Sequence, residues 1–298
     1  MKFLTHKRKQ SLIGMCFVLP ATILFISFTL YPAIRTAFLS LFDWDMLGDM
    51  EYIGLDNYKA MLEDERLKKI LSNTVILSMS SVVLKLSLGT LLAYFVFTMK
   101  SKIGSIIMES AIFLPIVLPM SVVSMVFIML FSTDTGAING FLHMLGLNKV
   151  EWLASERMPL VSVLIIDIWK GLGFFFIISL VAMREIPVAY LEAAELDGAS
   201  SMQKFLKIIL PCISASTLFL VINALITSIQ MFDPVYLIMK NGGPGDAVTT
   251  ISYYIWNTGI YERNVGYGSA LAIILCVVIM GITLIQFLLS RFWVNYDK

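Results

Sequence analysis

Polar and charged side chains interrupt several long apolar runs of this sequence, and they are the first candidates for a binding site. Such groups are costly against lipid, so they should face protein or a wet cavity. A tryptophan beside glycines can also stack on the apolar face of a sugar ring. The candidates for a solute pathway are Trp169, Lys170, Gly171, Asn223, Ser228, Gln230 and Asp233.

Two interpretations are open for each of Trp169, Lys170 and Lys85. Trp169 and Lys170 are also residue types that anchor the end of a span at the membrane interface. Lys85 lies near the middle of another apolar run, where a lysine costs roughly 2.5 to 3.5 kcal/mol on insertion. The surrounding Leu, Ile, Val and Phe residues outweigh that cost, so the run should insert. Lys85 should then face a neighbouring subunit or a wet cavity, in a structural or a transport role.

The sequence lacks the patterns of an enzyme. It contains no Gly-x-x-x-x-Gly-Lys-Ser/Thr loop to hold ATP phosphates, and neither His-Glu-x-x-His nor Gly-x-Ser-x-Gly. No two histidines or cysteines have metal-ligand spacing. We therefore expect no catalytic residue, no metal site and no cofactor bound by this chain. A formal net charge of +1 gives no sign of a nucleic-acid partner.

The composition indicates which elements position these residues. The 298 residues are 58% hydrophobic and only 14% charged, which is typical of an integral membrane protein. About 20 apolar residues cross a bilayer core, and the alternation of a β-barrel is absent. We expect an all-α membrane protein with six transmembrane helices, at about 12–31, 70–97, 106–131, 160–183, 213–238 and 268–289.

The charges predict the orientation of the chain. Basic residues precede the first apolar run, which lacks a convincing cleavage site and is therefore predicted to be a retained span. Six spans leave both termini in the cytoplasm, and lysine and arginine are denser in the predicted cytoplasmic segments. The expected parts are a cytoplasmic N-terminus (1–11), a first span (12–31), an external loop (32–69), a five-span core (70–289) with a cytoplasmic loop (185–211), and a cytoplasmic C-terminus (290–298).

Three further local features are predicted outside the regular spans. An amphipathic helix should follow Gly54 in the first external loop, and another short external helix should span 142–147 after a turn at 136–139. Pro115 and Pro119 should break the third span, so its freed carbonyl groups need partners in neighbouring helices or in a cavity.

The loop between the fourth and fifth apolar runs is too charged to cross a bilayer. Gly198 can adopt the left-handed conformation that ends a helix, so a first helix should run from about 187 to 197. Ser200 and Gln203 match a capping box, which begins a second helix. The loop is therefore predicted to be a helix-turn-helix.

The second helix of this loop has one apolar face. Met202, Phe205 and Ile209 recur at helical spacing and should pack together against the protein. Pro211 should force a new helix to start.

The same loop resembles the EAA signature of permease subunits of bacterial ATP-binding-cassette (ABC) importers. A Glu-Ala-Ala triplet is followed after three residues by Gly198, and after nine more by Ile-x-Leu-Pro. In that family the loop docks as a coupling helix into a groove on a cytoplasmic ATPase. The plainer alternative is an amphipathic hairpin that only joins two spans. The resemblance implies coupling roles for Glu192, Ala193, Ala194, Asp197, Gly198, Ile208, Leu210 and Pro211.

Weaker matches extend this resemblance over almost the whole chain. Gly-Leu-Asp-Asn-Tyr at 54–58, Asn-Gly-Gly-Pro-Gly at 241–245 and Gly-Tyr-Gly at 266–268 are similar to sugar-importer permeases. The resemblance implies a type I ABC importer permease fold and import of a sugar or oligosaccharide across the bacterial cytoplasmic (inner) membrane. The implied partners are a second homologous permease, two ABC ATPase subunits that hold ATP and Mg, an external solute-binding protein, the sugar and membrane lipid.

Other functions remain open from the sequence. Within the importer class, the solute could instead be glycerol-phosphate or another non-sugar compound. An ion-coupled secondary transporter would need a relay, for which Lys85, Asp167, Lys170 and Asp233 are the deep ionisable residues, but no clear inverted half-repeat is visible. A membrane assembly factor that transports nothing is the third alternative.

Overall fold

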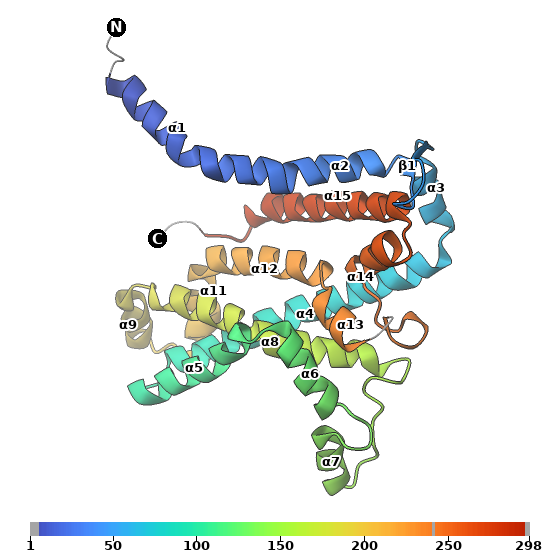
Figure 1. The fold of residues 1–298 in the computed structure, drawn as a ribbon. Coiled ribbons are helices and arrows are strands. Elements are labelled where there is room, and N and C mark those ends of the chain that lie inside the picture. Colours follow the sequence, from blue (N-terminus) through green and yellow to red (C-terminus); the bar gives the residue numbers. More distant parts are fainter. Residues whose placement is uncertain (1–5, 240–241, 296–298) are drawn as a thin grey trace. The chain divides into compact units, whose positions relative to one another are not determined.

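The computed structural model describes residues 6–239 and 242–295, which are almost entirely helical (Figure 1). The helices are α1 (His6–Phe25), α2 (Tyr31–Leu39), α3 (Asp56–Glu63), α4 (Glu65–Phe97), α5 (Lys102–Val117), α6 (Met120–Leu130), α7 (Ala137–Met144), α8 (Met158–Arg184), α9 (Val188–Leu196), α10 (Ser201–Lys204), α11 (Leu210–Cys212), α12 (Ser214–Ile229), α13 (Asp233–Ile238), α14 (Ile251–Trp256) and α15 (Val265–Ser290). Strands β1 (Phe42–Asp43) and β2 (Glu51–Tyr52) form one antiparallel pair.

The chain forms two compact units. The first consists of the segments up to Asp64 and from Ile255 to Cys276, and the second of the segments from Glu65 to Tyr254 and from Val277 onward. Helices α4 to α13 all belong to the second unit, whereas α14 and α15, which the predicted core (70–289) also includes, are divided between the two units. The candidate site is therefore described within that unit alone.

Five helical segments in the described ranges are long and apolar enough to cross a membrane. They are Ile13–Leu39, Glu65–Phe97, Met158–Arg184, Ser214–Ile238 and Val265–Ser290. Helices α5 and α6 pass the same test as a pair, but they are bent by 100° at their junction. Counting this pair as one broken span gives the six predicted spans, and the break falls beside the two prolines that predicted it.

Helical structure at the first span continues past the predicted end at residue 31, as far as Leu39. A π-helical turn, Ile26–Leu30, lies directly before Pro32 and joins α1 to α2. Proline clashes with the carbonyl group four residues earlier in an α-helix, and the wider turn relieves that clash. The apolar pattern indicated the span, but not this continuation.

In the first unit, the side chain of Asn57 joins α3 to the start of β1. Asn57 is the second residue of α3, the amphipathic helix predicted after Gly54, and is buried. Its Nδ2 donates to the carbonyl oxygens of Ser40 and Phe42, both at 3.0 Å. The short strands themselves were not predicted.

The core of the second unit is the packing of α4, α8 and α12. A Cβ atom at Gly89 of α4 would lie 2.7 Å from the Cβ of Phe175 in α8, so only glycine permits this close approach. Val82, Phe175, Leu220 and Ala224 form a buried cluster there. This contact fixes the geometry of three helices that line the candidate site.

The short helix predicted at 142–147 lies earlier, as α7. The expected turn at 136–139 is wrong because Asn139 is a buried residue inside the helix. Its amide group donates to the carbonyl oxygens of Thr133 and Val150 and accepts from Val150 N–H and Trp152 Nε1. Four hydrogen bonds to the flanking loops therefore set the position of α7.

The loop after α13 is held by a bidentate ion pair. Arg66, in the first turn of α4, donates to the two carboxylate oxygens of Asp246 at 2.7 and 2.9 Å, and Thr249 donates to Asp246 Oδ1 at 2.7 Å. Partial burial by itself raises the pKa of Asp246, but the hydrogen bonds from Arg66 and Thr249 and the charges of Arg66 and Lys69 lower that pKa below its ordinary value of 3.8.

We expect acid to loosen this loop. Because the pKa of Asp246 is lower in the folded loop, the ion pair stabilises the loop fully above about pH 4, and the stabilisation is lost as the pH falls through the folded pKa. Ala247 and Val248 donate backbone hydrogen bonds inside the loop. The hydrogen-exchange protection factors of these two amides should therefore decrease when the pH is lowered below about 4. In Asp246→Asn the protection should be low at every pH, and protection equal to the wild type would contradict the assignment.

Candidate functional site

The predicted helix-turn-helix between the fourth and fifth spans is present, and we call residues 188–212 the coupling segment. Gly198 has φ +76°, the left-handed conformation that the sequence predicted at the end of the first helix. The N–H groups of Gly198 and Ala199 donate to the carbonyl oxygens of Glu195 and Ala194. Ser200 caps α10, and both hydrogen bonds of the predicted capping box with Gln203 are formed.

An ion pair joins the two helices of the coupling segment across the turn. Lys204 Nζ lies 2.7 Å from Glu195 Oε1. The hydrogen bond and the positive charge of Lys204 lower the pKa of Glu195. The Glu195 side chain is solvent-exposed, so the ion pair contributes little to the stability of the fold, and its main effect is on the angle between α9 and α10.

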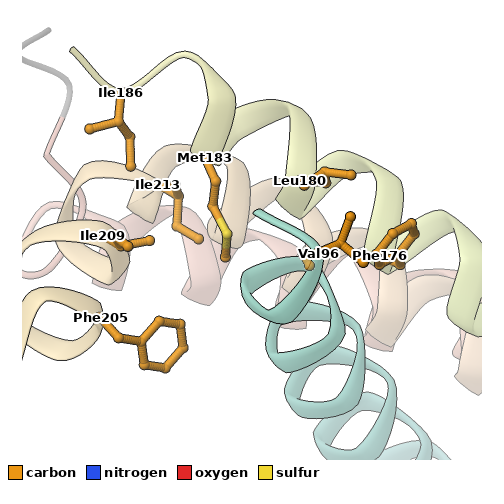
Figure 2. Close-up of a cluster of buried hydrophobic side chains, with 9 residues drawn as sticks. Val96, Phe176, Leu180, Met183, Ile186, Phe205, Ile209 and Ile213 are labelled. Atoms are coloured by element: carbon orange, nitrogen blue, oxygen red, sulfur yellow. The ribbon is translucent and has the colours of Figure 1, made fainter. Parts of the chain in front are cut away.

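A buried apolar cluster attaches the coupling segment to the membrane helices. Phe176, Leu180 and Met183 of α8 belong to one buried cluster with Phe205 and Ile209 of the coupling segment; in Figure 2, Met183 lies toward Ile209 and Ile213, and Phe176 lies near Val96. The full cluster is Ala93, Val96, Phe176, Leu180, Met183, Ile186, Phe205, Ile209 and Ile213. Each large side chain that leaves water in this way contributes about 1.5–3 kcal/mol. The second half of the coupling segment therefore moves with α8.

Two details of the predicted second helix are wrong. Met202 is exposed, and only Phe205 and Ile209 of the predicted face are buried. The helix also does not restart at Pro211, because a π-helical turn at Phe205–Ile209 precedes the proline and α11 continues through it. The break comes at Ile213, directly before α12.

The residues of the EAA signature lie mostly on the open side of the coupling segment. Glu192, Ala193, Asp197 and Gly198 are exposed, and Ala194 is buried. The last three, Ile208, Leu210 and Pro211, are half-buried. Leu196 is 90% exposed, which leaves an apolar side chain uncovered beside the signature.

A cavity of about 420 Å³ lies between the membrane helices of the second unit. This volume is within the range of small-molecule sites. Its lining residues come from α4, α5, α6, α8, α12 and α13 and from the break between α12 and α13: Lys85, Ile116, Met120, Asp167, Lys170, Gly171, Phe174, Phe175, Asn223, Thr227, Gln230, Met231, Phe232, Asp233 and Pro234.

One helix break, between α12 and α13, supplies part of the cavity wall, and a second, between α5 and α6, lies beside it; other side chains bond to carbonyl groups at both breaks. At the break between α5 and α6, Lys170 Nζ donates to the carbonyl oxygen of Leu118 at 2.7 Å. At the break between α12 and α13, Thr250 Oγ1 donates to the carbonyl oxygen of Met231 at 2.6 Å. Non-helical backbone at membrane depth is tolerated only with such partners, as predicted for the third span.

A buried polar network crosses three helices on one side of the cavity. Lys85 of α4 donates to the Asp167 carboxylate of α8 at 2.7 Å. Ser81 donates to Asp167 at 2.6 Å and lies 2.9 Å from the hydroxyl of Ser228 in α12. Lys85 therefore faces a cavity, one of its two expected surroundings. A Cβ atom at Gly171 would lie 2.8 Å from Lys85 Cε, so glycine makes room for the lysine.

The structure brings most of the predicted solute-pathway residues together. Five of the seven line the cavity: Lys170, Gly171, Asn223, Gln230 and Asp233. The other two do not. The ring of Trp169 packs against Phe127, with centroids 5.4 Å apart, and Ser228 is buried in the polar network.

Sequence reasoning missed several lining residues. Phe174, Phe175 and Phe232 are apolar, so nothing distinguishes them in sequence from packing residues of a span. Thr227 lies one helical turn after Asn223, and that spacing on the polar side of α12 could have identified it. In the described residues no cluster of metal-ligating side chains is found.

These features are typical of a class of protein: a membrane-embedded transport subunit with an internal cavity and an attached helical hairpin. Residues 85–294 match the model of the binding-protein-dependent transport system inner membrane component family, and the chain belongs to that family. It is therefore an integral membrane protein and a permease subunit rather than an enzyme, as the sequence predicted.

Individual relatives extend the match along the chain. The probable ABC transporter permease protein YesP of Bacillus subtilis is 33% identical over 98% of this chain and 94% of its own length. The arabinooligosaccharides transport system permease protein AraP of the same organism is 29% identical over 92% of this chain and 87% of its own length.

A solved structure confirms the predicted fold class. A chain of the bacterial alginate ABC transporter, in complex with an alginate pentasaccharide-bound periplasmic protein, is similar with a TM-score of 0.87 and 26% identity. The match covers 97% of this chain and 98% of that chain.

Proposed function

We propose that this chain is the permease subunit of an ATP-driven importer for a sugar or oligosaccharide, which an external solute-binding protein delivers. The similarity to AraP and to the alginate transporter supports a carbohydrate solute. The observation that carries the proposal is on α8. Lys170 and Gly171 line the cavity, and Phe176 to Met183 of the same helix hold the coupling segment. One continuous helix thus joins the two functional parts.

In this proposal, the coupling segment docks into a partner ATPase. Two ATPase subunits hold ATP and Mg, and a second, homologous permease completes the pathway. Ala193, which is exposed, permits close approach to the ATPase groove, whereas Ala194 is buried inside the chain; Glu192 fixes the first coupling helix. The exposed apolar side chains of Val188, Tyr190 and Leu196 support an interface on this side, since a partner would cover them.

Movement of the coupling segment would be transmitted through α8 and α12. Because the buried cluster joins the segment to α8, closure of the ATPases would tilt α8 as a rigid body. The cavity would then open alternately to the outside and to the cytoplasm. The coupling segment and both termini lie on the cytoplasmic side of the bacterial inner membrane in this arrangement.

The cavity chemistry favours a solute rich in hydroxyl groups. Lys85 is paired with Asp167, and Lys170 is engaged by carbonyl oxygens, so neither ammonium group is free. Asn223, Thr227 and Gln230 can donate and accept hydrogen bonds, and within the described part of the chain Asp233 has no cationic partner. A free carboxylate repels phosphate, which favours a neutral sugar over glycerol-phosphate. Family membership leaves an ion-coupled secondary transporter without support.

Purification from the host tests this function directly. The tagged chain, extracted in a gentle detergent, should carry an ATPase and a second permease that mass spectrometry identifies. ATP hydrolysis by this assembly should rise when the solute-binding protein and a neutral oligosaccharide are added. Recovery of the chain alone, with uptake that follows a proton or sodium gradient, would overturn the proposal.

The cavity has its own test in the same assembly. Asn223→Ala and Gln230→Ala should each raise the solute concentration for half-maximal uptake about tenfold, because a lost hydrogen bond to a desolvated polar group costs about 1–3 kcal/mol. Thr217→Ala on the same helix is the control, since Thr217 does not line the cavity and bonds only to its own helix. If uptake and specificity are unchanged in both cavity variants, these residues only pack.

A further inference from the structure

A second cavity of about 420 Å³ lies at the ends of α4 and α8 nearest the coupling segment, and we call it the basic cavity. It is separate from the solute cavity and shares no residue with it. Its walls are the end of α4, the linker that follows and the start of α5, with the last residue of α8. The charged residues that line it are Lys100, Lys102, Glu109 and Arg184.

The basic cavity has two positive charges in excess. Arg184 lies 2.6 Å from Glu109, whose carboxylate also accepts a hydrogen bond from Ser105 at 2.6 Å. Lys100 and Lys102 are exposed, and neither forms an ion pair with any residue that the structure describes. The one carboxylate of the cavity is thus occupied, and two ammonium groups lack an anion.

The basic cavity lies at the ends of helices that are long and apolar enough to cross a membrane. The apolar stretch of α4 ends at Phe97, and α5 begins at Lys102. On α5, Ile103, Ile106 and Ile107 are exposed in the chain. Such an apolar face next to basic side chains matches the two parts of a phospholipid, acyl chains and a headgroup.

We propose that the basic cavity binds an anionic phospholipid, with its phosphodiester group between Lys100 and Lys102 and an acyl chain along Ile103, Ile106 and Ile107. Ammonium groups bind phosphate as point charges, and basic pockets between membrane helices recognise anionic headgroups. Ile106 lines the cavity and is also exposed, so it connects the headgroup site to the acyl surface. The site does not depend on the identity of the solute.

The bound lipid would contact the helix that carries transport motion. Arg184 is the last residue of α8, and α9 of the coupling segment begins at Val188. A headgroup at Arg184 would therefore brace α8 against α5 at the end where the coupling segment is attached. The lipid would thereby influence coupling without touching the solute.

Native mass spectrometry of the full chain in a neutral detergent tests the site. The probes are dioleoyl-phosphatidylglycerol, which has a net negative headgroup, and dioleoyl-phosphatidylcholine, which has the same phosphate with a compensating cation. The wild type should retain the anionic lipid in preference. Lys100→Gln with Lys102→Gln should raise the dissociation constant for this lipid about thirtyfold in a lipid titration, since two basic groups near the surface are removed.

Two further variants separate a specific site from general charge or damage. Lys68→Gln with Lys149→Gln removes the same charge from exposed lysines near the starts of α4 and α8, far along the chain from the cavity, and should retain lipid as the wild type does. Glu109→Gln should increase retention of phosphatidylglycerol, because it removes the negative charge of the cavity and releases Arg184. A damaged cavity would change retention in the opposite direction.

Three results would overturn the proposal. Equal retention of the two lipids would mean that binding does not depend on the net charge of the headgroup. Equal loss of phosphatidylglycerol in both double variants would mean that Lys100 and Lys102 bind it no better than other exposed lysines do. If soluble glycerophosphoglycerol or inorganic phosphate displaces phosphatidylglycerol at matched concentrations, the acyl surface contributes nothing and the site is one for a free phosphate.

Discussion

Replacing Gly198 with valine should abolish most uptake while the chain still enters the membrane. At φ +76° an L-residue costs about 1–2 kcal/mol, and a branched side chain is a strong outlier. The turn would have to open, which breaks the Glu195–Lys204 ion pair and changes the angle between α9 and α10. We expect ATP-driven uptake in reconstituted vesicles to fall at least about tenfold, at an unchanged amount of membrane-inserted chain.

Gly198→Asn is the matched control. Asparagine tolerates the left-handed conformation, and a Cβ atom at this position meets nothing within 4 Å, so the turn should survive. Uptake should then stay within a few-fold of the wild type. If the valine variant transports normally, the turn has no coupling role. If valine and asparagine are equally damaging, side-chain bulk at a partner surface would be responsible instead of turn geometry.

The second large effect is expected at the Lys85–Asp167 ion pair. Its side chains are only 6% and 17% exposed, so neither charge is solvated once its partner is removed. Asp167→Ala should destabilise the chain by about 3–5 kcal/mol, because it strands a buried ammonium group. Thermal unfolding of the purified chain in detergent should show a clear drop. Lys85→Met with Asp167→Leu should recover most of the stability, because both buried charges are removed.

Uptake by this double variant separates structure from transport. A stable variant that no longer transports would mean that the pair contacts the solute, whereas a stable variant with normal uptake would assign the pair to packing between α4 and α8. Stability of Asp167→Ala equal to that of the wild type would contradict the buried-pair interpretation, since some other group would have to compensate Lys85.

The features that sequence predicted well have signals confined to a few neighbouring residues. Gly198 for the turn, Ser200 with Gln203 for the capping box and Pro119 for the broken span each act on the backbone within about one helical turn. The structure contains all three. The apolar runs likewise gave the spans because hydropathy needs no knowledge of tertiary partners.

The features that failed depend on partners far along the chain. Trp169 could have faced either side of α8, and the direction was decided by Phe127 of α6, which its ring contacts. Ser228 was expected in the pathway but bonds to Ser81 of α4. The shift of α7 follows from the bonds of Asn139 to loops on both sides. In each case periodicity gives the face of a helix, but not what lies opposite.

The solute cavity and the attachment of the coupling segment are formed by different residues, so the two can change independently in this family. Residues of α12, of the break after it and of the start of α13 supply most of the polar side chains of the cavity wall, while the buried cluster and the Gly198 turn position the coupling segment. The two sets share no side chain, although α4 and α8 contribute to both and the coupling segment leads directly into α12. Under the proposed function, we expect exchange of the stretch from Asn223 to Pro234 to alter solute selectivity, while the coupling segment and its contact with the ATPase stay unchanged.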